Sequence, residues 1–333
     1  MKEADIRPLD LFNDYLTLAR RDAESLAHAS GQFTAVPCPG CGSAQQTPAF
    51  EKLGFSYVSC AACDSLYVSP RPSADQLAVF YREGASVKFW STDFFRQTAE
   101  SRRRNLFAPR AQLVQEFVGR HAERASSFVD IGSGYGVFLE EIQRLDRFST
   151  VLGIEPGPTL AAVCRQRGFR VIEKPLEAVT PDECQVDVAT AFEVVEHPFD
   201  PLQFVTAACQ VLRPGGLLVL TTLTISGFDL QVLWDRSKSI HPPHHLNLLS
   251  IHGLQRLMER AGLELVELST PGRLDVDIVA NMVQENPTIP MPRFVRSLVQ
   301  ANDATRQAFQ SFLSQHRLSS HVRVVARRPM ETG

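Results

Sequence analysis

The stretch that most constrains this chain is 128–136, where an apolar run leads into an aspartate and then into three glycines at alternate positions. Apolar residues recur at helical spacing directly afterwards, so the pattern predicts a buried strand, a tight turn and a helix. Glycines at such a turn let backbone N–H groups approach a ligand closely, and the N-terminus of the following helix favours an anion. Dinucleotide-binding loops place their last two glycines three positions apart, whereas Gly132, Gly134 and Gly136 alternate. The spacing therefore favours a ligand other than NAD.

Length and charge exclude few functions. The chain has 333 residues, enough for one large domain with a satellite or for two domains. Its net charge of −3 gives no sign of a nucleic-acid partner or of a membrane surface. No apolar run approaches the roughly 20 residues that cross a bilayer, and the N-terminal residues lack a signal-peptide core. We therefore expect a cytoplasmic protein without a membrane partner.

Four of the seven cysteines form two C-x-x-C pairs, Cys38 with Cys41 and Cys60 with Cys63. Four thiolates at this spacing suit a tetrahedral Zn²⁺, which can replace the core that a short segment cannot build. Because four protein ligands close the coordination shell, we predict a structural zinc and not a catalytic metal. The alternatives are two adventitious pairs or a redox-active pair, and the strand–helix context of a thioredoxin-like motif is absent.

The order of elements after the glycine loop predicts a parallel sheet. Strands expected at 151–154, 169–172, 186–192 and 217–223 alternate with helices at 158–167 and 201–212, which implies right-handed crossovers. The second strand ends in Glu155, where a carboxylate can accept hydrogen bonds from both ribose hydroxyls of a nucleotide. A sixth strand is expected at 263–268, and the alternating stretch 321–326 is interpreted as an antiparallel edge strand. The insertion between them should be helical near 294–298 and 305–313.

A helical, aromatic-rich pattern also covers 87–119, with an expected break near Pro109. Arg102, Arg103 and Arg104 lie in it. We interpret these arginines as a solvated helix face, and a patch that meets the phosphates of a nucleotide-activated substrate is the alternative.

Residues 125–271 resemble the class I S-adenosylmethionine (SAM)-dependent methyltransferases. They carry the loop Asp-Ile-Gly-Ser-Gly-Tyr-Gly, the acidic strand end, a Glu-Val-Val-Glu-His segment and a Leu-Arg-Pro-Gly-Gly turn, in that order. The resemblance implies an α/β fold with a Rossmann-like seven-stranded sheet, and binding of SAM and its product S-adenosylhomocysteine (SAH). The cofactor contacts that it implies are Asp130, Gly132, Ser133, Gly134, Gly136, Glu155, Leu176 beside the adenine ring, and Phe192 and Glu193 at the end of the fourth strand.

The cysteine pairs ahead of this domain further resemble the zinc-containing sugar C-methyltransferases and related enzymes of polysaccharide and natural-product pathways. In those enzymes a Glu-His pair aligns with His244 and His245, so the resemblance implies that His245 is the base. His244 stands where they have glutamate, which makes O-methylation at least as well supported as C-methylation. His244 itself and His197, which Pro198 biases away from helical geometry, are the other candidates.

The expected organisation is an N-terminal helical segment (1–34), the four-cysteine module (35–70), a helical linker or cap (71–120), the SAM-binding domain (121–271), a helical insertion (272–319), and a final antiparallel strand and tail (320–333). We expect in-line methyl transfer to a small polar acceptor, a hydroxyl or carbon of a sugar or nucleotide-sugar-like molecule. The oligomeric state stays open. One alternative is a zinc-containing RNA methyltransferase, against which the near-neutral charge argues. The other is a non-catalytic SAM-binding protein.

Overall fold

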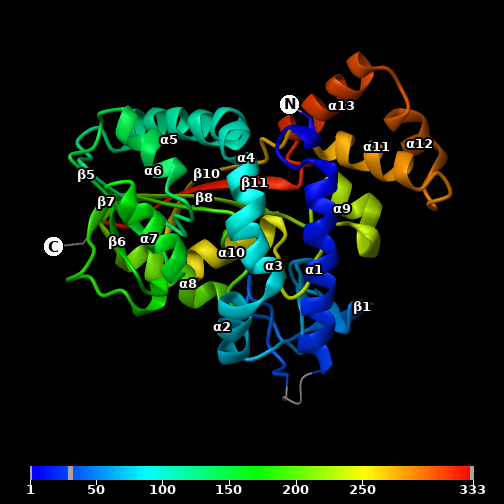
Figure 1. Cartoon of the computed structure of the whole chain (residues 1–333), viewed down its shortest axis with the longest axis horizontal. Coiled ribbons are helices and arrows are strands. Elements are labelled where there is room, and N and C mark those ends of the chain that lie inside the picture. The colour runs from blue at the N-terminus through cyan, green and yellow to red at the C-terminus, as the bar shows by residue number, and fades with distance from the viewer. Residues whose placement is uncertain (1, 29–32, 331–333) are drawn as a thin grey trace.

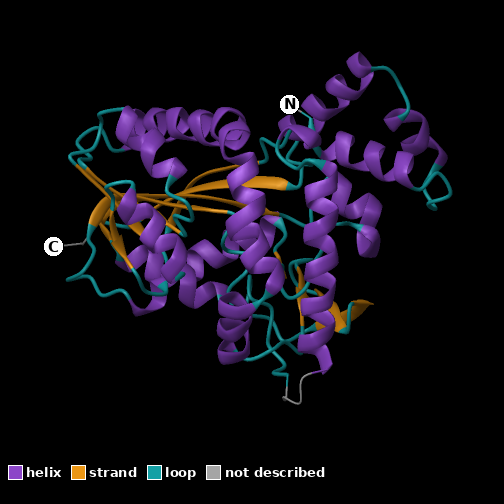
Figure 2. Cartoon of the chain, viewed as in Figure 1, coloured by secondary structure: helices purple, strands orange, loops and turns teal. Residues whose placement is uncertain are grey.

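A seven-stranded mixed sheet forms the centre of the molecule, with strands in the order β10-β11-β8-β7-β4-β5-β6 (Figures 1 and 2). The computed structural model describes residues 2–28 and 33–330. Five strands run parallel: β4 (Ser127–Ile131), β5 (Thr150–Ile154), β6 (Arg170–Ile172), β7 (Val186–Phe192) and β8 (Leu212–Leu223). The expected parallel sheet is thereby confirmed.

The sequence-based reading of two strands needs correction. β11 (His321–Arg327) is not at the edge, because it pairs antiparallel with β8 on one side and with β10 (Glu264–Ser269) on the other. Its valines are buried because Val322 and Val324 join the apolar cluster on one face of the sheet and Val325 joins the cluster on the other face. The residues Arg213-Pro214-Gly215-Gly216 were expected to form a turn, but they extend β8 towards its start. The register between β7 and β8 shifts at this point, and the irregularity accommodates the proline and glycines.

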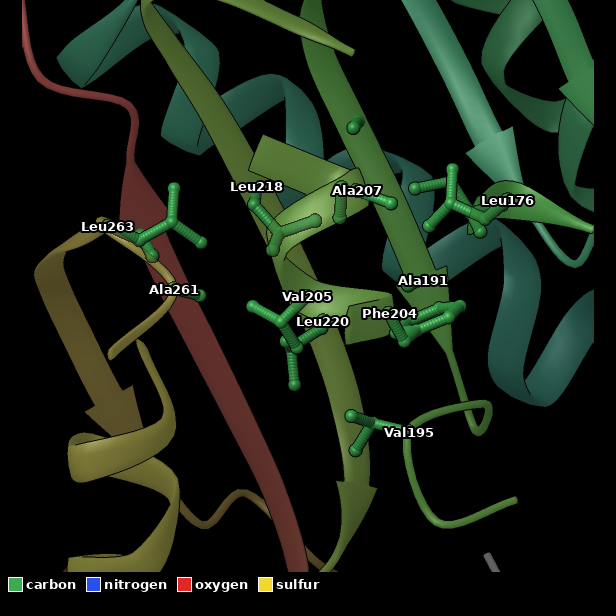
Figure 3. Packing of buried hydrophobic residues seen from close by; sticks show 14 of the residues in the cluster. Leu176, Ala191, Val195, Phe204, Val205, Ala207, Leu218, Leu220, Ala261 and Leu263 are labelled. Carbon is green, nitrogen blue, oxygen red and sulfur yellow. The ribbon is translucent and has the colours of Figure 1, made fainter. Parts of the chain in front are cut away.

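Helices pack on both faces of the sheet and bury it. α5 (Ala108–His121) and α6 (Val137–Arg144) share one apolar cluster with β4. α8 (Pro201–Gln210) and α10 (Ile251–Arg260) pack on the opposite cluster, where Val205 and Phe204 meet Leu220 of β8 (Figure 3). Strands covered on both faces read as continuous apolar runs, which is why they could be predicted from the sequence. The remaining helix of this region is α7 (Pro158–Gln166), with a short turn η4 (Leu176–Ala178).

The four-cysteine segment forms a second, smaller sheet that joins the main domain. It comprises β1 (Gln46–Lys52), β2 (Phe55–Cys60), β3 (Leu66–Val68) and β9 (Asn247–Leu248). β9 comes from the second half of the chain and pairs with β3. Leu246 and Leu248 share an apolar cluster with Phe55 and Leu66. The small sheet is therefore fixed in place by residues that follow the main sheet's fifth strand.

The helices before the main sheet cover its carboxyl-terminal edge. α1 (Leu9–His28) runs along the molecule after the short turn η1 (Glu3–Asp5), and α2 (Ala74–Glu83) follows the small sheet (Figure 1). A continuous helix then runs through α3 (Ala85–Phe89), a π turn η2 (Trp90–Phe94), α4 (Phe95–Arg102), a second π turn η3 (Arg103–Phe107) and α5. The expected break at Pro109 is wrong. The proline lies in the first turn of α5, directly after a π turn that accommodates its ring.

The insertion after β10 has a small core of its own. α11 (Asp275–Glu285), α12 (Arg293–Val299) and α13 (Asp303–Gln315) enclose Val279, Val283 and Leu313, and α11 also packs on α9 (Phe228–Leu233). The helices expected near 294–298 and 305–313 are confirmed, while α11 was not anticipated. A short turn, η5 (Trp234–Arg236), follows α9. No helix in the described part of the chain is both apolar enough and long enough to cross a bilayer.

Candidate active site

A cavity of about 660 Å³ opens beyond the carboxyl ends of the parallel strands. Its floor is the glycine loop after β4 and the ends of β5, β7 and β8, and its roof comes from α1 and from the helices of 85–121. Open parallel sheets bind ligands at this edge, because the loops that follow the strands converge there. The cavity is therefore the place to look for the chemistry of this chain.

All three glycines of the loop adopt backbone conformations that other residues rarely adopt. The φ angles of Gly132, Gly134 and Gly136 are 75°, 53° and 71°. A Cβ atom at Gly132 would also lie 2.9 Å from a methyl group of Val194. The predicted glycine turn therefore has a steric basis at each position, and Ser133 between them donates from its hydroxyl to the Asp130 carbonyl at 2.8 Å.

Two acidic residues lie at the ends of neighbouring strands beside this loop. Asp130 is 4% exposed and accepts a hydrogen bond from the Thr190 hydroxyl at 2.7 Å. Glu155 accepts from the backbone N–H groups of Gly134 and Gly157, both at 2.9 Å. Burial raises the pKa of Asp130 to about 7 and raises that of Glu155. Both carboxyl groups line the cavity, as the predicted cofactor contacts would require.

The other three predicted cofactor contacts have different surroundings. Phe192 lines the cavity and lies beneath the guanidinium of Arg110, 4.9 Å from the ring centroid. Glu193 accepts hydrogen bonds from Arg110 at 2.6 Å and from Thr221 at 2.8 Å. Leu176, in contrast, is 3% exposed and packs in the core between the sheet and α8. It does not belong to the cavity lining, so its contact with an adenine ring stays a prediction.

Hydrogen bonds hold all three candidate histidines. His244 is buried, and its Nε2 lies 2.9 Å from the Ser86 hydroxyl. His197 directs Nδ1 at the His244 carbonyl oxygen (2.6 Å) and Nε2 at the Glu193 carbonyl oxygen (3.1 Å). Both ring nitrogens of His197 therefore face carbonyl acceptors, so neither nitrogen is directed at a substrate hydroxyl.

His245, like His244, has one ring nitrogen in a hydrogen bond and one without a partner among the described residues. Nδ1 lies 2.5 Å from the Ser239 carbonyl oxygen, which fixes the proton on Nδ1 and leaves a lone pair on Nε2. Nε2 has no hydrogen-bond partner among the described residues, and the side chain lines the cavity. Burial and the neighbouring His197 lower the pKa of His245 to about 3. The ring is therefore neutral at physiological pH and can accept a hydrogen bond from a bound hydroxyl.

Glu196 completes a cluster that the sequence analysis did not assign. It is 1% exposed, accepts from the Thr222 hydroxyl at 2.8 Å, and lies with His197 and His245 in a group whose ligand atoms are within 4.8 Å of one another. Burial and the nearby Glu193 raise the pKa of Glu196 to about 8. Burial alone would also raise the pKa of Glu193, but His321 and Arg110 lower it to about 2. The two carboxyl groups thus divide into one anion and one neutral acid.

This division gives a testable dependence of stability on pH. In the unfolded chain Glu196 ionises near its ordinary value of 4.5, whereas the folded protein keeps the proton up to about 8. The folded state therefore binds more protons in this interval, and the free energy of unfolding should fall as the pH rises through it. We expect the free energy of unfolding of Glu196→Gln, measured with urea, to change less between these two pH values than that of the unchanged protein. Glu264→Gln, at an exposed position, should show the same change as the unchanged protein. An identical slope in Glu196→Gln would contradict the assignment.

The four cysteines of the small sheet come together as predicted. Sγ of Cys38 lies 3.5 Å from that of Cys63, Sγ of Cys41 lies 3.5 Å from that of Cys60, and all four are within 4.8 Å of one another. A tetrahedral Zn²⁺ with Zn–S bonds of about 2.3 Å places its sulfurs about 3.8 Å apart, and none of the four forms a disulfide. The donor set therefore fits a closed structural zinc site, remote from the cavity lining.

Residues 99–268 match a family described as a methyltransferase domain. The match extends from α4, above the cavity, to β10. It includes the glycine loop, the acidic strand ends and residues 241–247, which we call the histidine loop. The chain belongs to the SAM-dependent methyltransferases.

Two curated relatives are both named ubiquinone biosynthesis O-methyltransferase. The first, from Methylobacterium nodulans, is 32% identical over 180 residues, which cover 49% of this methyltransferase and 70% of the relative. The second, from a Methylobacterium species, is 36% identical over 115 residues, or 32% and 45% of the two chains.

Solved structures give broader but weaker matches. The plantazolicin methyltransferase BpumL in complex with SAH is 13% identical, with a TM-score of 0.49 over 76% of this chain and 94% of that one. A possible histamine N-methyltransferase from Thermotoga maritima is 16% identical, with a TM-score of 0.45 over 72% and 99%. Because both scores are below 0.5, the family assignment rests on the sequence match and the strand order.

Three residues of the cavity were not identified as site residues from the sequence. Arg110 reaches Glu193 from α5, Tyr15 reaches the histidine loop from α1, and Glu196 lies beside His245. Only Glu196 carried a signal, as the second acid of Glu-Val-Val-Glu-His. The other two lie in helices whose orientation over the sheet is set by packing.

Proposed function

We propose that this methyltransferase transfers the methyl group of SAM to a hydroxyl of a small polar acceptor. The observation that carries the proposal is that the glycine loop, the Glu155 carboxylate and the free Nε2 of His245 all face one cavity. In this proposal Asp130, Glu155 and the loop from Gly132 to Gly136 hold the donor. Phe192 and Glu193 complete its site, and Leu176 approaches the adenine from the core.

The chemistry follows from the leaving group. A sulfonium leaves readily, so the protein has chiefly to align the acceptor oxygen, the methyl carbon and the sulfur, and to exclude water. Nε2 of His245 accepts the hydroxyl proton as the carbon–oxygen bond forms, while the Ser239 carbonyl holds the ring in its Nδ1–H tautomer. His244 and His197 position this loop through their hydrogen bonds. The four cysteines hold a structural Zn²⁺ that takes no part in the transfer.

The acceptor is proposed at the level of chemical class. Aromatic side chains of the cavity roof offer surfaces on which the ring of a sugar or nucleotide-sugar-like molecule can stack: Tyr15, Trp90, Phe95 and Phe107. The name shared by the two relatives favours transfer to oxygen over transfer to carbon. It also provides a second candidate, an acceptor from ubiquinone biosynthesis. Incubating the enzyme with SAM and each class of acceptor, and detecting the methylated product by mass, distinguishes the two.

Replacing Glu155 with alanine tests the donor site. The substitution removes the acceptor proposed for the ribose hydroxyls and releases the Gly134 amide, so we expect SAH to bind about 10- to 100-fold more weakly in calorimetry. Alanine at the exposed Glu123 is the matched control and should bind SAH like the unchanged protein. The proposal fails if the unchanged protein does not bind SAH or SAM while it binds NAD.

A further inference from the structure

The guanidinium of Arg102 faces the cavity from the end of α4 without an acidic partner. Three aromatic rings surround it, with centroids 5.7 Å (Trp90), 5.6 Å (Phe95) and 5.9 Å (Phe107) from its central carbon. Its Nε is buried without a hydrogen bond, and within residues 2–28 and 33–330 the side chain has no ion pair. None of its nitrogens has a hydrogen-bond partner among the described residues, so its N–H groups remain available to a ligand.

The two neighbouring arginines behave differently. Arg103 donates to Glu140 and, at 2.7 Å, to Glu141, so acidic groups of α6 neutralise it. Arg104 is exposed to solvent. The solvated helix face expected for the three arginines is thus wrong for Arg102, because α4 turns this side chain inward and places it among aromatic rings.

A second cation, Arg7, lies on the same roof and has one long ion pair. Arg7 lies over the ring of Phe12 at 5.4 Å, its Nε is buried without a partner, and its nearest carboxylate oxygen, on Glu3, is 3.9 Å away. Burial, with the nearby charges of Arg7 and Arg110, lowers the pKa of Arg102 to about 9. Arg110 already pairs with Glu193. Of these three arginines, Arg102 is therefore the one without an acidic partner among the described residues.

The backbone around Arg102 is unusual as well. A π turn lies on each side of α4, η2 with Trp90 before it and η3 with Phe107 after it. π turns interrupt regular helical hydrogen bonding and occur frequently at functional sites. Here both turns contribute rings that contact the guanidinium. The local fold is thus arranged around this one charge.

We propose that Arg102, assisted by Arg7, binds an anionic group of the methyl acceptor, a phosphate or a carboxylate. The inference rests on the proposed function, since it places this anion beside the hydroxyl that receives the methyl group. The planar N–H edge of arginine matches the oxygen atoms of such groups. Trp90 contacts Tyr15 at 4.9 Å, and Tyr15 contacts His244 at 5.6 Å, which connects this site to the histidine loop. The donor's own carboxylate can instead be met by the glycine-loop amides at the N-terminus of α6.

The test uses inorganic pyrophosphate as the probe, titrated calorimetrically into the full-length protein preloaded with SAH. We expect Arg102→Gln to weaken pyrophosphate binding about 10- to 100-fold, the range for losing a charge-assisted hydrogen bond. Arg104→Gln, at the exposed neighbour, should leave pyrophosphate binding unchanged. Adding chloride to equal ionic strength should also leave pyrophosphate binding unchanged, which controls for non-specific charge screening. SAH affinity, measured separately, should be the same in all three proteins.

Each other outcome overturns the inference. Absence of pyrophosphate binding to the SAH-loaded protein, or equal weakening by Arg104→Gln, removes the specific anion site. Weaker SAH binding by Arg102→Gln with unchanged pyrophosphate binding assigns the arginine to the donor carboxylate instead. Arg102→Lys keeps the charge and loses the planar edge, so it should weaken pyrophosphate binding less than glutamine does, and it carries the test if the glutamine variant does not fold. Failure of the unchanged protein to bind SAH would overturn the proposed function, which is a separate result.

Discussion

Replacing His245 with alanine should slow methyl transfer by about 10²- to 10⁴-fold, the range for losing a positioned general base. The reason is geometric, because the side chain of His245 lines the cavity and its Nε2 has no hydrogen-bond partner among the described residues. The measurement is kcat for whichever acceptor the unchanged enzyme methylates, with SAH affinity measured in parallel. SAH affinity should be nearly unchanged, since the ring contacts the acceptor and not the donor.

Alanine at His252, an exposed histidine of α10, is the matched control and should retain full activity. The pH profile gives a second test. Because burial and His197 lower the pKa of His245 to about 3, the ring stays neutral between pH 5 and pH 8, so its own protonation should not slow the reaction anywhere in that window. Unchanged turnover in His245→Ala would remove this residue from the mechanism and leave alignment alone to account for the rate.

Removing one thiolate from the four-cysteine cluster should have the other large effect, on stability. We expect Cys63→Ser to lower the zinc content from about one ion per chain to nearly none, and to lower the free energy of unfolding by at least about 3 kcal/mol, because a structural zinc site contributes folding energy directly. Metal analysis and urea unfolding, each with and without a chelator, are the measurements. The chelator should destabilise the unchanged protein and leave Cys63→Ser unaffected.

The damage should extend beyond the small sheet. A Cβ on Gly40 would lie 2.9 Å from the Gly253 carbonyl oxygen, so the first cysteine knuckle packs directly against α10. Arg260 of that helix donates to the Gly40 carbonyl oxygen at 2.8 Å. Serine at Cys209, a partly exposed cysteine of α8 outside the cluster, is the control and should keep both zinc and stability. An unchanged zinc content in Cys63→Ser would show that the four thiols are not the ligands.

Much of the main sheet could be anticipated because its signals are local. The strand before the glycine loop has an apolar centre, the turn requires positive φ at three glycines, and Glu155 follows the next strand directly. The first residues of two helices could also be predicted, because each helix follows a capping side chain. Asp200 accepts from the Leu202 and Gln203 amides at the start of α8, and Ser250 accepts from the Gly253 amide at the start of α10.

The incorrect predictions concern strand position or side-chain burial, which depend on residues that are distant in the sequence. The alternation in β11 is also compatible with an edge strand, and its pairing with β10 as well as β8 places it inside the sheet. Arg102 belongs to a charged run, and two π turns direct it away from solvent.

The sequence by itself determined the glycine turn, the acidic strand ends and the paired cysteines, because each depends on backbone geometry or on ligand spacing within a few consecutive residues. Tertiary structure alone decided that Glu196 lies beside His245, that Nε2 is the free nitrogen of that histidine, and that Arg102 faces the cavity. These relations join residues distant in sequence. They arise when apolar faces pack against one another, and no short pattern along the chain encodes which side chains that packing brings together.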